Sequence, residues 1–219
     1  MESDFYFQFK NSQIFKAVAL SQNPIFRFRK FEKRLFSLSS LLFLILFFIS
    51  DFSKPFFGLF LLSLNLFLVA LLKDLFFEQK IKTQRKKEDI FEKIDFEIAK
   101  AIYNALKSSK GQKINSSIFL YFLLDEKNPK IRFIFSRIFA PLSELKRRLL
   151  EDKREEEEIE NLIKELANKR EKIQIGEILF VLAQKNKIFK DFLINFELKP
   201  EDLKKVSDWV DYLEEEFLE

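Results

Sequence analysis

Two long apolar runs follow one another in the first third of the chain. They cover residues 35–52 and 55–72, and the second continues with little interruption to Phe77. At 1.5 Å per residue, a helix of this length spans roughly 27 Å, close to the ~30 Å hydrocarbon core of a bilayer. The connector between the runs is short and polar. The pattern therefore predicts a transmembrane helical hairpin over residues 35–77.

The first 34 residues have a different pattern, in which aromatic residues alternate with polar ones. The aromatic positions of the alternation are Phe5, Phe7 and Phe9. A polar stretch at 11–13 and a second apolar segment at 14–20 follow them. Alternation followed by a turn predicts a small β-hairpin. An interfacial segment, with aromatic side chains at the depth of the lipid head groups, is the alternative. In both cases residues 1–34 form an N-terminal juxtamembrane segment.

Beyond a predicted helical linker at 78–93, the apolar spacing is that of helices. Apolar residues recur at intervals of three and four over 96–106, which gives one apolar face. Asn115 or Ser116 is a suitable cap for the next helix. A short apolar helix is expected near 133–139, and Pro141 begins another.

The second half of this region repeats the first. Three pairs of residues share a separation of 59 positions: Ile114 and Ile173, Phe133 and Phe192, Pro141 and Pro200. A four-helix unit cannot bury its apolar faces alone, so two such units are expected to stack on one core. The predicted fold class is all-α, a transmembrane hairpin plus a cytoplasmic bundle of about eight helices. Its two pseudo-symmetric repeats, at about 94–150 and 159–217, lie in a domain over 94–219.

Basic residues on both outer sides of the hairpin predict its orientation. The connector carries only Lys54, whereas eleven basic residues flank the runs: Arg27, Arg29, Lys30, Lys33, Arg34, Lys73, Lys80, Lys82, Arg85, Lys86 and Lys87. Lys and Arg near the ends of a span favour the cytoplasmic side. We therefore expect two spans in the inner, cytoplasmic membrane with both termini in the cytoplasm. A buried core hairpin of a soluble protein is the alternative.

Composition restricts the chemistry. The chain has no Cys and no His, which excludes disulfides, Cys or His catalysis and the usual zinc sites. We find no catalytic constellation and expect no enzyme activity, no cofactor and no metal. Ser63 and Asn65, in the middle of the second run, are expected to bond across the hairpin. The net charge of +4 is concentrated beside the runs, which favours membrane lipids over nucleic acid as a partner.

Two segments of the C-terminal region carry a resemblance to a known family. Residues 114–124 (INSSIFLYFLL) resemble the start of a Clp N-terminal repeat. Residues 192–203 resemble its end, where an aliphatic helix leads through Leu-x-Pro-Glu-x-Leu into the last helix. The region 88–218, about 60% of the chain, is similar in length and order to the two-repeat N-terminal domain of Clp-type AAA+ unfoldases.

The resemblance implies a membrane-anchored module that recruits unfolded or tagged client proteins or adaptors for an ATP-dependent unfoldase or protease. No Walker A sequence is present, so the AAA+ motor is expected in cis, in a missing C-terminal part, or in trans. The alternative is a stand-alone membrane-tethered helical scaffold without a link to proteolysis.

The same resemblance gives two candidate partner-binding residues. The family's Glu-His pair is replaced by Ser117-Ile118 in the first repeat. In the second repeat Glu177 lies within one position of the family's acidic residue, and no His follows it. From the sequence alone, Glu177 also fits a carboxylate placed at a helix N-terminus, where the helix dipole favours it.

Overall fold

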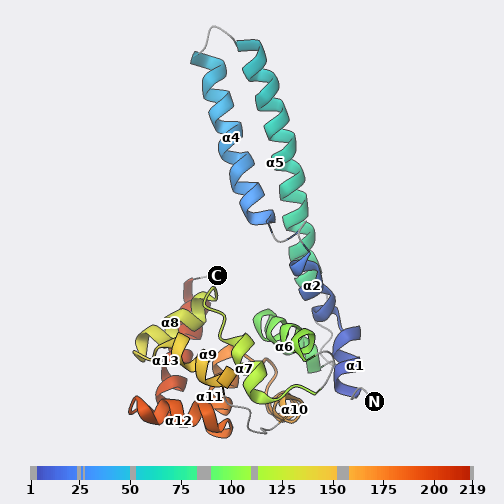
Figure 1. Ribbon diagram of the computed structural model, residues 1–219. Coiled ribbons are helices and arrows are strands. Elements are labelled where there is room, and N and C mark those ends of the chain that lie inside the picture. The colour runs from blue at the N-terminus through green and yellow to red at the C-terminus, as the bar shows by residue number, and fades with distance from the viewer. Residues whose placement is uncertain are drawn as a thin grey trace. The chain divides into compact units, whose positions relative to one another are not determined.

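The computed structural model describes residues 4–23, 26, 28–49, 53–82, 90–109, 113–151 and 158–217. Within these ranges it holds twelve α-helices, one short 3-10 helix and no strand, so the all-α prediction is confirmed (Figure 1). The chain divides into two compact units. We call them the helical unit (Met1–Phe15 with Lys86–Glu219) and the hairpin unit (Lys16–Arg85).

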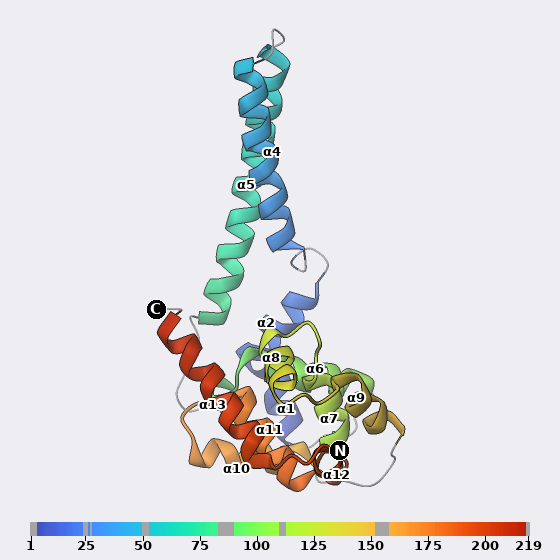
Figure 2. The same ribbon diagram turned by 90° about the vertical axis from the view of Figure 1, so that its left-hand side faces the viewer.

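The hairpin unit is built on two long helices, α4 (Arg29–Ile49) and α5 (Ser53–Lys82). They run side by side in opposite directions, as two views show (Figures 1 and 2). Among the described side chains of α5, four are buried, at intervals of seven, four and three that keep them on one face of the helix: Ser63, Ala70, Asp74 and Phe77. The small residues at the first two of these positions allow the two backbones to approach closely.

One helix of the described residues is long and apolar enough to cross a membrane. It is the Lys54–Phe77 part of α5, with a mean hydropathy of 2.3 and few buried side chains. The uncharged part of α4 begins after Arg34 and reaches Ile49, which corresponds to roughly 22 Å of helix. The first predicted run also includes residues 50–52, which lie outside the described part of the chain.

The helical unit contains the eight C-terminal helices. They are α6 (Phe96–Ser108), α7 (Ser116–Leu123), α8 (Pro129–Arg137), α9 (Leu142–Glu151), α10 (Ile159–Lys169), α11 (Ile175–Lys185), α12 (Lys187–Asn195) and α13 (Pro200–Phe217). Their shared core includes the fully buried Ile98, Ile102, Phe119, Leu120, Phe189 and Phe192. Asn caps begin three of the helices: Asn115 for α7, Asn128 for α8 and Asn186 for α12. Of the two residues proposed to cap α7, the structure uses Asn115.

Two short backbone contacts join segments that precede helices. Ile94 pairs with Ile173 in parallel, and Asn115 pairs with Glu158 in antiparallel orientation. In the first contact the Asp95 N–H donates to the Ile173 carbonyl at 3.2 Å. Beyond these contacts, α8 packs against α13 and α12 packs against α9.

The β-hairpin predicted near the N-terminus is wrong. The segment forms two helices, α1 (Asp4–Asn11) and α2 (Gln13–Gln22). The buried residues of α1 are Phe5, Tyr6 and Phe9, which share one face of a helix, whereas Phe7 is exposed. The apparent alternation thus arose because two of the three Phe positions also fit the helical period. Ser12 separates the helices, and its Oγ accepts from the Phe15 N–H at 3.2 Å.

Candidate functional site

Helices α8 and α13 of the helical unit pack on each other, and exposed aromatic side chains lie on or next to both. The exposed fraction is 44% for Trp209, 55% for Tyr212 and 89% for Phe139, which follows α8. Trp209 also contacts Phe133, with ring centroids 5.4 Å apart. We define the aromatic surface as these residues with the cation that stacks on them: Phe133, Arg137, Phe139, Trp209 and Tyr212.

A cation lies over the two packed rings. The Arg137 guanidinium carbon lies 5.0 Å from the ring centroid of Phe133 and 5.3 Å from that of Trp209. Beside them, Lys130 Nζ pairs with Asp211 Oδ1 at 3.2 Å, and both of these side chains are mostly buried. The ion pair links α8 to α13. Aromatic residues and Arg are enriched at protein–protein interfaces relative to the rest of the surface.

Phe139 has a backbone conformation that is rare for its residue type. Its φ is 52°, in the left-handed region that Gly adopts most easily. The Ala140 N–H donates to the Phe135 carbonyl, so Phe139 occupies the left-handed position at the C-terminal end of α8. Glu197, with φ 57°, occupies the same position after α12, where the Leu198 N–H donates to the Leu193 carbonyl. A bulky side chain that is strained and almost fully exposed marks a candidate for function.

The two residues proposed from the family resemblance lie elsewhere and contact different partners. Ser117 is only 3% exposed, and its Oγ accepts from Asn186 Nδ2 at 3.0 Å. Glu177 accepts from the Gln174 N–H through Oε2 at 3.4 Å and pairs with Arg170 through Oε1 at 2.9 Å. The structure thus places Ser117 in the interior and Glu177 at the start of α11, where its carboxylate bonds to the helix N-terminus.

The residue that is 59 positions after Ser117 is Gly176, and its surroundings explain why it lacks a side chain. A Cβ at this position would collide with the Cβ of Ser207 on α13. Gly176 therefore allows α11 and α13 to pack at short range. The Ser207 hydroxyl is buried in this contact and makes no hydrogen bond within the described part of the chain.

Helix α1 is attached to the helical unit by aromatic packing and one buried hydrogen bond. The rings of Phe5 and Phe9 lie 4.9 and 5.3 Å from the ring of Phe91. The Tyr6 hydroxyl accepts a hydrogen bond from the Ile114 N–H at 2.9 Å. Burial raises the pKa of Tyr6 to about 12, because an ionised phenol would lose its hydration there. Residues that precede the hairpin unit thus belong to the same unit as residues that follow it.

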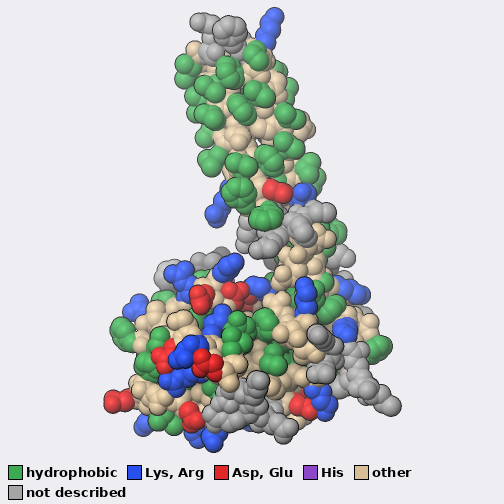
Figure 3. Space-filling view, viewed as in Figure 1, with side chains coloured by type: hydrophobic (Ala, Val, Ile, Leu, Met, Phe, Trp, Pro, Cys, Tyr) green, Lys and Arg blue, Asp and Glu red, His purple; other side chains and the backbone are tan. Residues whose placement is uncertain are grey.

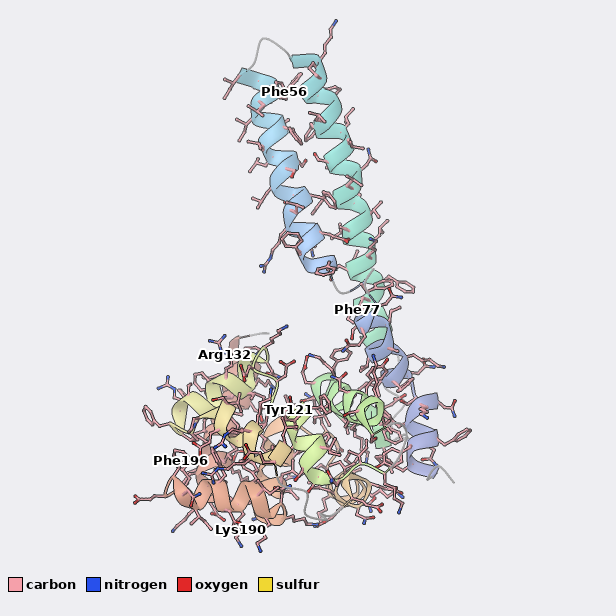
Figure 4. All side chains as sticks on the ribbon, viewed as in Figure 1. Phe56, Phe77, Tyr121, Arg132, Lys190 and Phe196 are labelled. Atoms are coloured by element: carbon pink, nitrogen blue, oxygen red, sulfur yellow. The ribbon has the colours of Figure 1, made fainter. Side chains whose placement is uncertain are left out.

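Reciprocal ion pairs join α4 and α5 at the end of the hairpin where α4 begins. Lys33 pairs with Asp74 at 2.9 Å, and Lys73 pairs with Glu32 at 3.2 Å. From these pairs to the connector, apolar side chains cover the face of the hairpin that Figure 3 shows. Figure 4 labels Phe56 near the connector and Phe77 near the opposite end of this apolar length.

The polar residues within the apolar length do not bond across the hairpin as the sequence led us to expect. Ser63 Oγ donates to the Phe60 carbonyl at 2.9 Å, and Asn65 Nδ2 donates to the Leu61 carbonyl at 2.8 Å. Both bonds lie within α5. Ser63 is buried against α4, whereas Asn65 is exposed on the outside. The described residues contain no group of acidic side chains that could hold a metal ion.

Comparisons of the chain with protein-family models, with curated proteins and with solved structures found no match.

Proposed function

We propose that this protein is a membrane-anchored recruitment module, in which the hairpin crosses the bilayer twice and the helical unit binds client proteins or adaptors in the cytoplasm. One observation carries the proposal. Helix α1 precedes the hairpin unit in the chain, and α6–α13 follow it, yet both belong to one compact unit. This grouping supports a topology in which both ends of the hairpin unit lie on the same side of the membrane, so that the number of spans is even.

The outside of the hairpin supports its placement in lipid. Exposed large apolar side chains cover both helices, in a continuous surface of a size that soluble monomers rarely expose. They include Leu38, Leu41, Leu42, Ile45, Phe48, Leu61, Leu62, Leu68, Val69 and Leu72. At the end of the hairpin where α4 begins, Lys33 pairs with Asp74 and Lys73 pairs with Glu32. This pairing lowers the free-energy cost of placing these charges beside hydrocarbon. Both spans and the cytoplasmic location of the termini are part of this proposal.

We further propose that the eight C-terminal helices form a double repeat, as the resemblance to the Clp N-terminal domain implies. The two backbone pairings between the halves differ in orientation, since Ile94 with Ile173 is parallel and Asn115 with Glu158 is antiparallel. The helix contacts are matched instead, because α8 packs on α13 and α12 packs on α9. Matched contacts of this kind are what a pseudo-twofold axis between two repeats requires.

The aromatic surface is the proposed binding site for apolar segments of unfolded or tagged clients or of adaptors. Exposed aromatic rings and an Arg that stacks on them supply the residue types that dominate binding energy at protein interfaces. The hairpin would keep this weak binder beside an AAA+ motor, in the same polypeptide or in a partner chain, and so raise its effective concentration. The helical unit has no proposed catalytic role.

Phe139→Gly tests the binding site, with Glu197→Gly as a matched control. Both variants place Gly at a left-handed position after a helix, so both should fold at least as stably as the native chain. Only the first removes an exposed ring. With the full chain in lipid nanodiscs, we expect Phe139→Gly to weaken binding of a reduced, carboxymethylated model protein by about tenfold.

Glu197→Gly should bind the unfolded probe as the native protein does. Equal affinities for the two Gly variants would contradict the assignment of the site. If the native protein binds neither the unfolded probe nor an ATPase from solubilised membranes, the recruitment function is wrong. The tethered scaffold is then the remaining interpretation.

A further inference from the structure

We infer that two copies of this chain associate in the membrane through the outer face of α5, with Asn65 of one copy hydrogen-bonded to Asn65 of the other. The inference rests on the proposed placement of the hairpin in lipid. We define the α5 outer face as the exposed residues on the side of α5 away from α4: Gly58, Leu61, Leu62, Asn65, Leu68, Val69 and Leu72.

Asn65 is the polar residue at the centre of this face. It follows Ser63 by two positions, a rotation of about 200° around a helix, and Ser63 is buried against α4. Asn65 therefore points away from the hairpin partner. It lies roughly 16 Å of helix from Lys54 and roughly 12 Å from Lys73, which bracket the apolar length. This position is close to the middle of the bilayer, where no water is present to bond with an exposed amide.

The amide of Asn65 is only partly satisfied within the chain. Nδ2 donates to the Leu61 carbonyl at 2.8 Å, and Oδ1 accepts no hydrogen bond among the described residues. A carboxamide has two N–H donors and an oxygen with two lone pairs, so a second donor position also remains. Lipid chains offer neither donors nor acceptors. Another transmembrane helix with a polar group at the same depth would satisfy both.

A second copy of this chain fits that description in depth, chemistry and shape. Two copies inserted with the same topology are related by an axis along the membrane normal, so each residue meets its counterpart at its own depth. A carboxamide is both donor and acceptor and thus complements itself across such an axis. Gly58, two turns from Asn65 on the same face, has no atom near the position of a Cβ, so a second helix can approach closely there.

The chain has no Cys, so single-Cys variants report this contact without a background. Leu72→Cys lies two turns from Asn65 on the outer face. Leu35→Cys on α4 is the control at matched depth, because the Lys33–Asp74 pair sets the register of the two helices. The full-length variants are placed in phosphatidylcholine and phosphatidylglycerol vesicles and oxidised with copper phenanthroline. We expect a disulfide-linked product of twice the 26.4 kDa chain mass from Leu72→Cys and little from Leu35→Cys.

Substitutions of Asn65 in the Leu72→Cys background test the hydrogen bond. Asn65→Leu should lower the dimer association constant by about three- to tenfold, which corresponds to roughly 0.6–1.4 kcal/mol for a hydrogen bond between transmembrane helices. Asn65→Gln keeps the carboxamide and should keep most of the dimer. Alkaline carbonate extraction of the same vesicles reports insertion independently.

The outcomes separate this inference from the proposed function. Retention of all variants in the membrane, without linkage of Leu72→Cys above the control, would overturn the dimer and leave the hairpin in place. The same holds if Asn65→Leu in the Leu72→Cys background is linked as well as Leu72→Cys alone. Release of the native chain by carbonate would overturn both proposals.

Discussion

Asn186 is the polar centre of the helical unit. Its Oδ1 accepts from the Phe189 N–H at 2.8 Å and so caps α12. Its Nδ2 donates to the hydroxyls of Ser116 and Ser117, both at 3.0 Å, at the start of α7. One buried amide therefore fixes the beginnings of two helices that lie about 70 residues apart in the chain.

Replacing Asn186 by Ala should cost more than the loss of an ordinary cap. The change removes the cap and leaves two buried hydroxyls with fewer partners, so we expect the free energy of unfolding to fall by about 2–4 kcal/mol. Asn128→Ala, which removes a cap without such a buried link, should cost about 1 kcal/mol. Denaturant titrations of the two variants in the same detergent measure the difference. Equal losses would show that the link to α7 contributes nothing.

At the residue scale, helix starts can be predicted from the sequence, whereas contacts between distant residues cannot. The pairs Asn128-Pro129 and Asn186-Lys187 precede apolar segments, so helix starts near them are predictable from local chemistry. The burial of Ser117 is not, because it depends on a residue 69 positions away. The left-handed Phe139 is also hidden in the sequence, since the usual Gly or Asn signal for such a position is absent.

Helix α1 precedes the hairpin unit in the chain but belongs to the helical unit. It buries Phe5, Tyr6 and Phe9 in the helical unit. The Tyr6 hydroxyl accepts a hydrogen bond from the backbone N–H of Ile114. A raised pKa means that the native state holds the phenolic proton more tightly than the unfolded chain does. The resulting stability is complete below pH 10, the ordinary pKa, and is lost as the pH rises toward about 12.

The stability of the helical unit should therefore depend on Tyr6 at alkaline pH. Between pH 9 and pH 12 we expect the native chain to lose roughly 2–3 kcal/mol more than Tyr6→Phe does. Tyr6→Phe should be less stable than the native chain at pH 7 by about 1–2 kcal/mol, because the Ile114 N–H loses its acceptor. Unfolding midpoints across this pH range provide the measurement. Parallel pH curves for the two proteins would contradict the docking of α1 through Tyr6.

At the scale of elements, the sequence predicts the C-terminal helices better than the N-terminal ones. Long amphipathic repeats and Pro or Asn boundaries indicate α6 to α13, and the structure begins α13 at Pro200 as expected. In α1, a segment of eight residues, three Phe at alternate positions fit a strand and nearly fit a helix. Packing on Phe91, far along the chain, decides between them, and that contact cannot be read from local pattern.

At the scale of the whole molecule, the chain leaves the helical unit after α1 and returns to it after α5. Under the proposed placement of the hairpin in a membrane, this connectivity puts both ends of the hairpin on the same side. The apolar runs, their lengths and the basic residues beside them can be identified in the sequence. That the segments before and after the hairpin belong to one unit is known only from the fold. Which face of α5 points outward is likewise known only once α4 is in place beside it.

The central claim is that the hairpin crosses the membrane twice, with α1 and the C-terminal helices on the same, cytoplasmic side. Single-Cys variants in this Cys-free chain test it directly: Phe7→Cys in α1, Lys54→Cys at the connector end of α5 and Ser136→Cys in α8, all exposed positions. With a membrane-impermeant maleimide on right-side-out vesicles, we predict labelling of Lys54→Cys alone, and of the other two only after permeabilisation. Labelling of Phe7→Cys and Ser136→Cys from opposite sides would contradict the account.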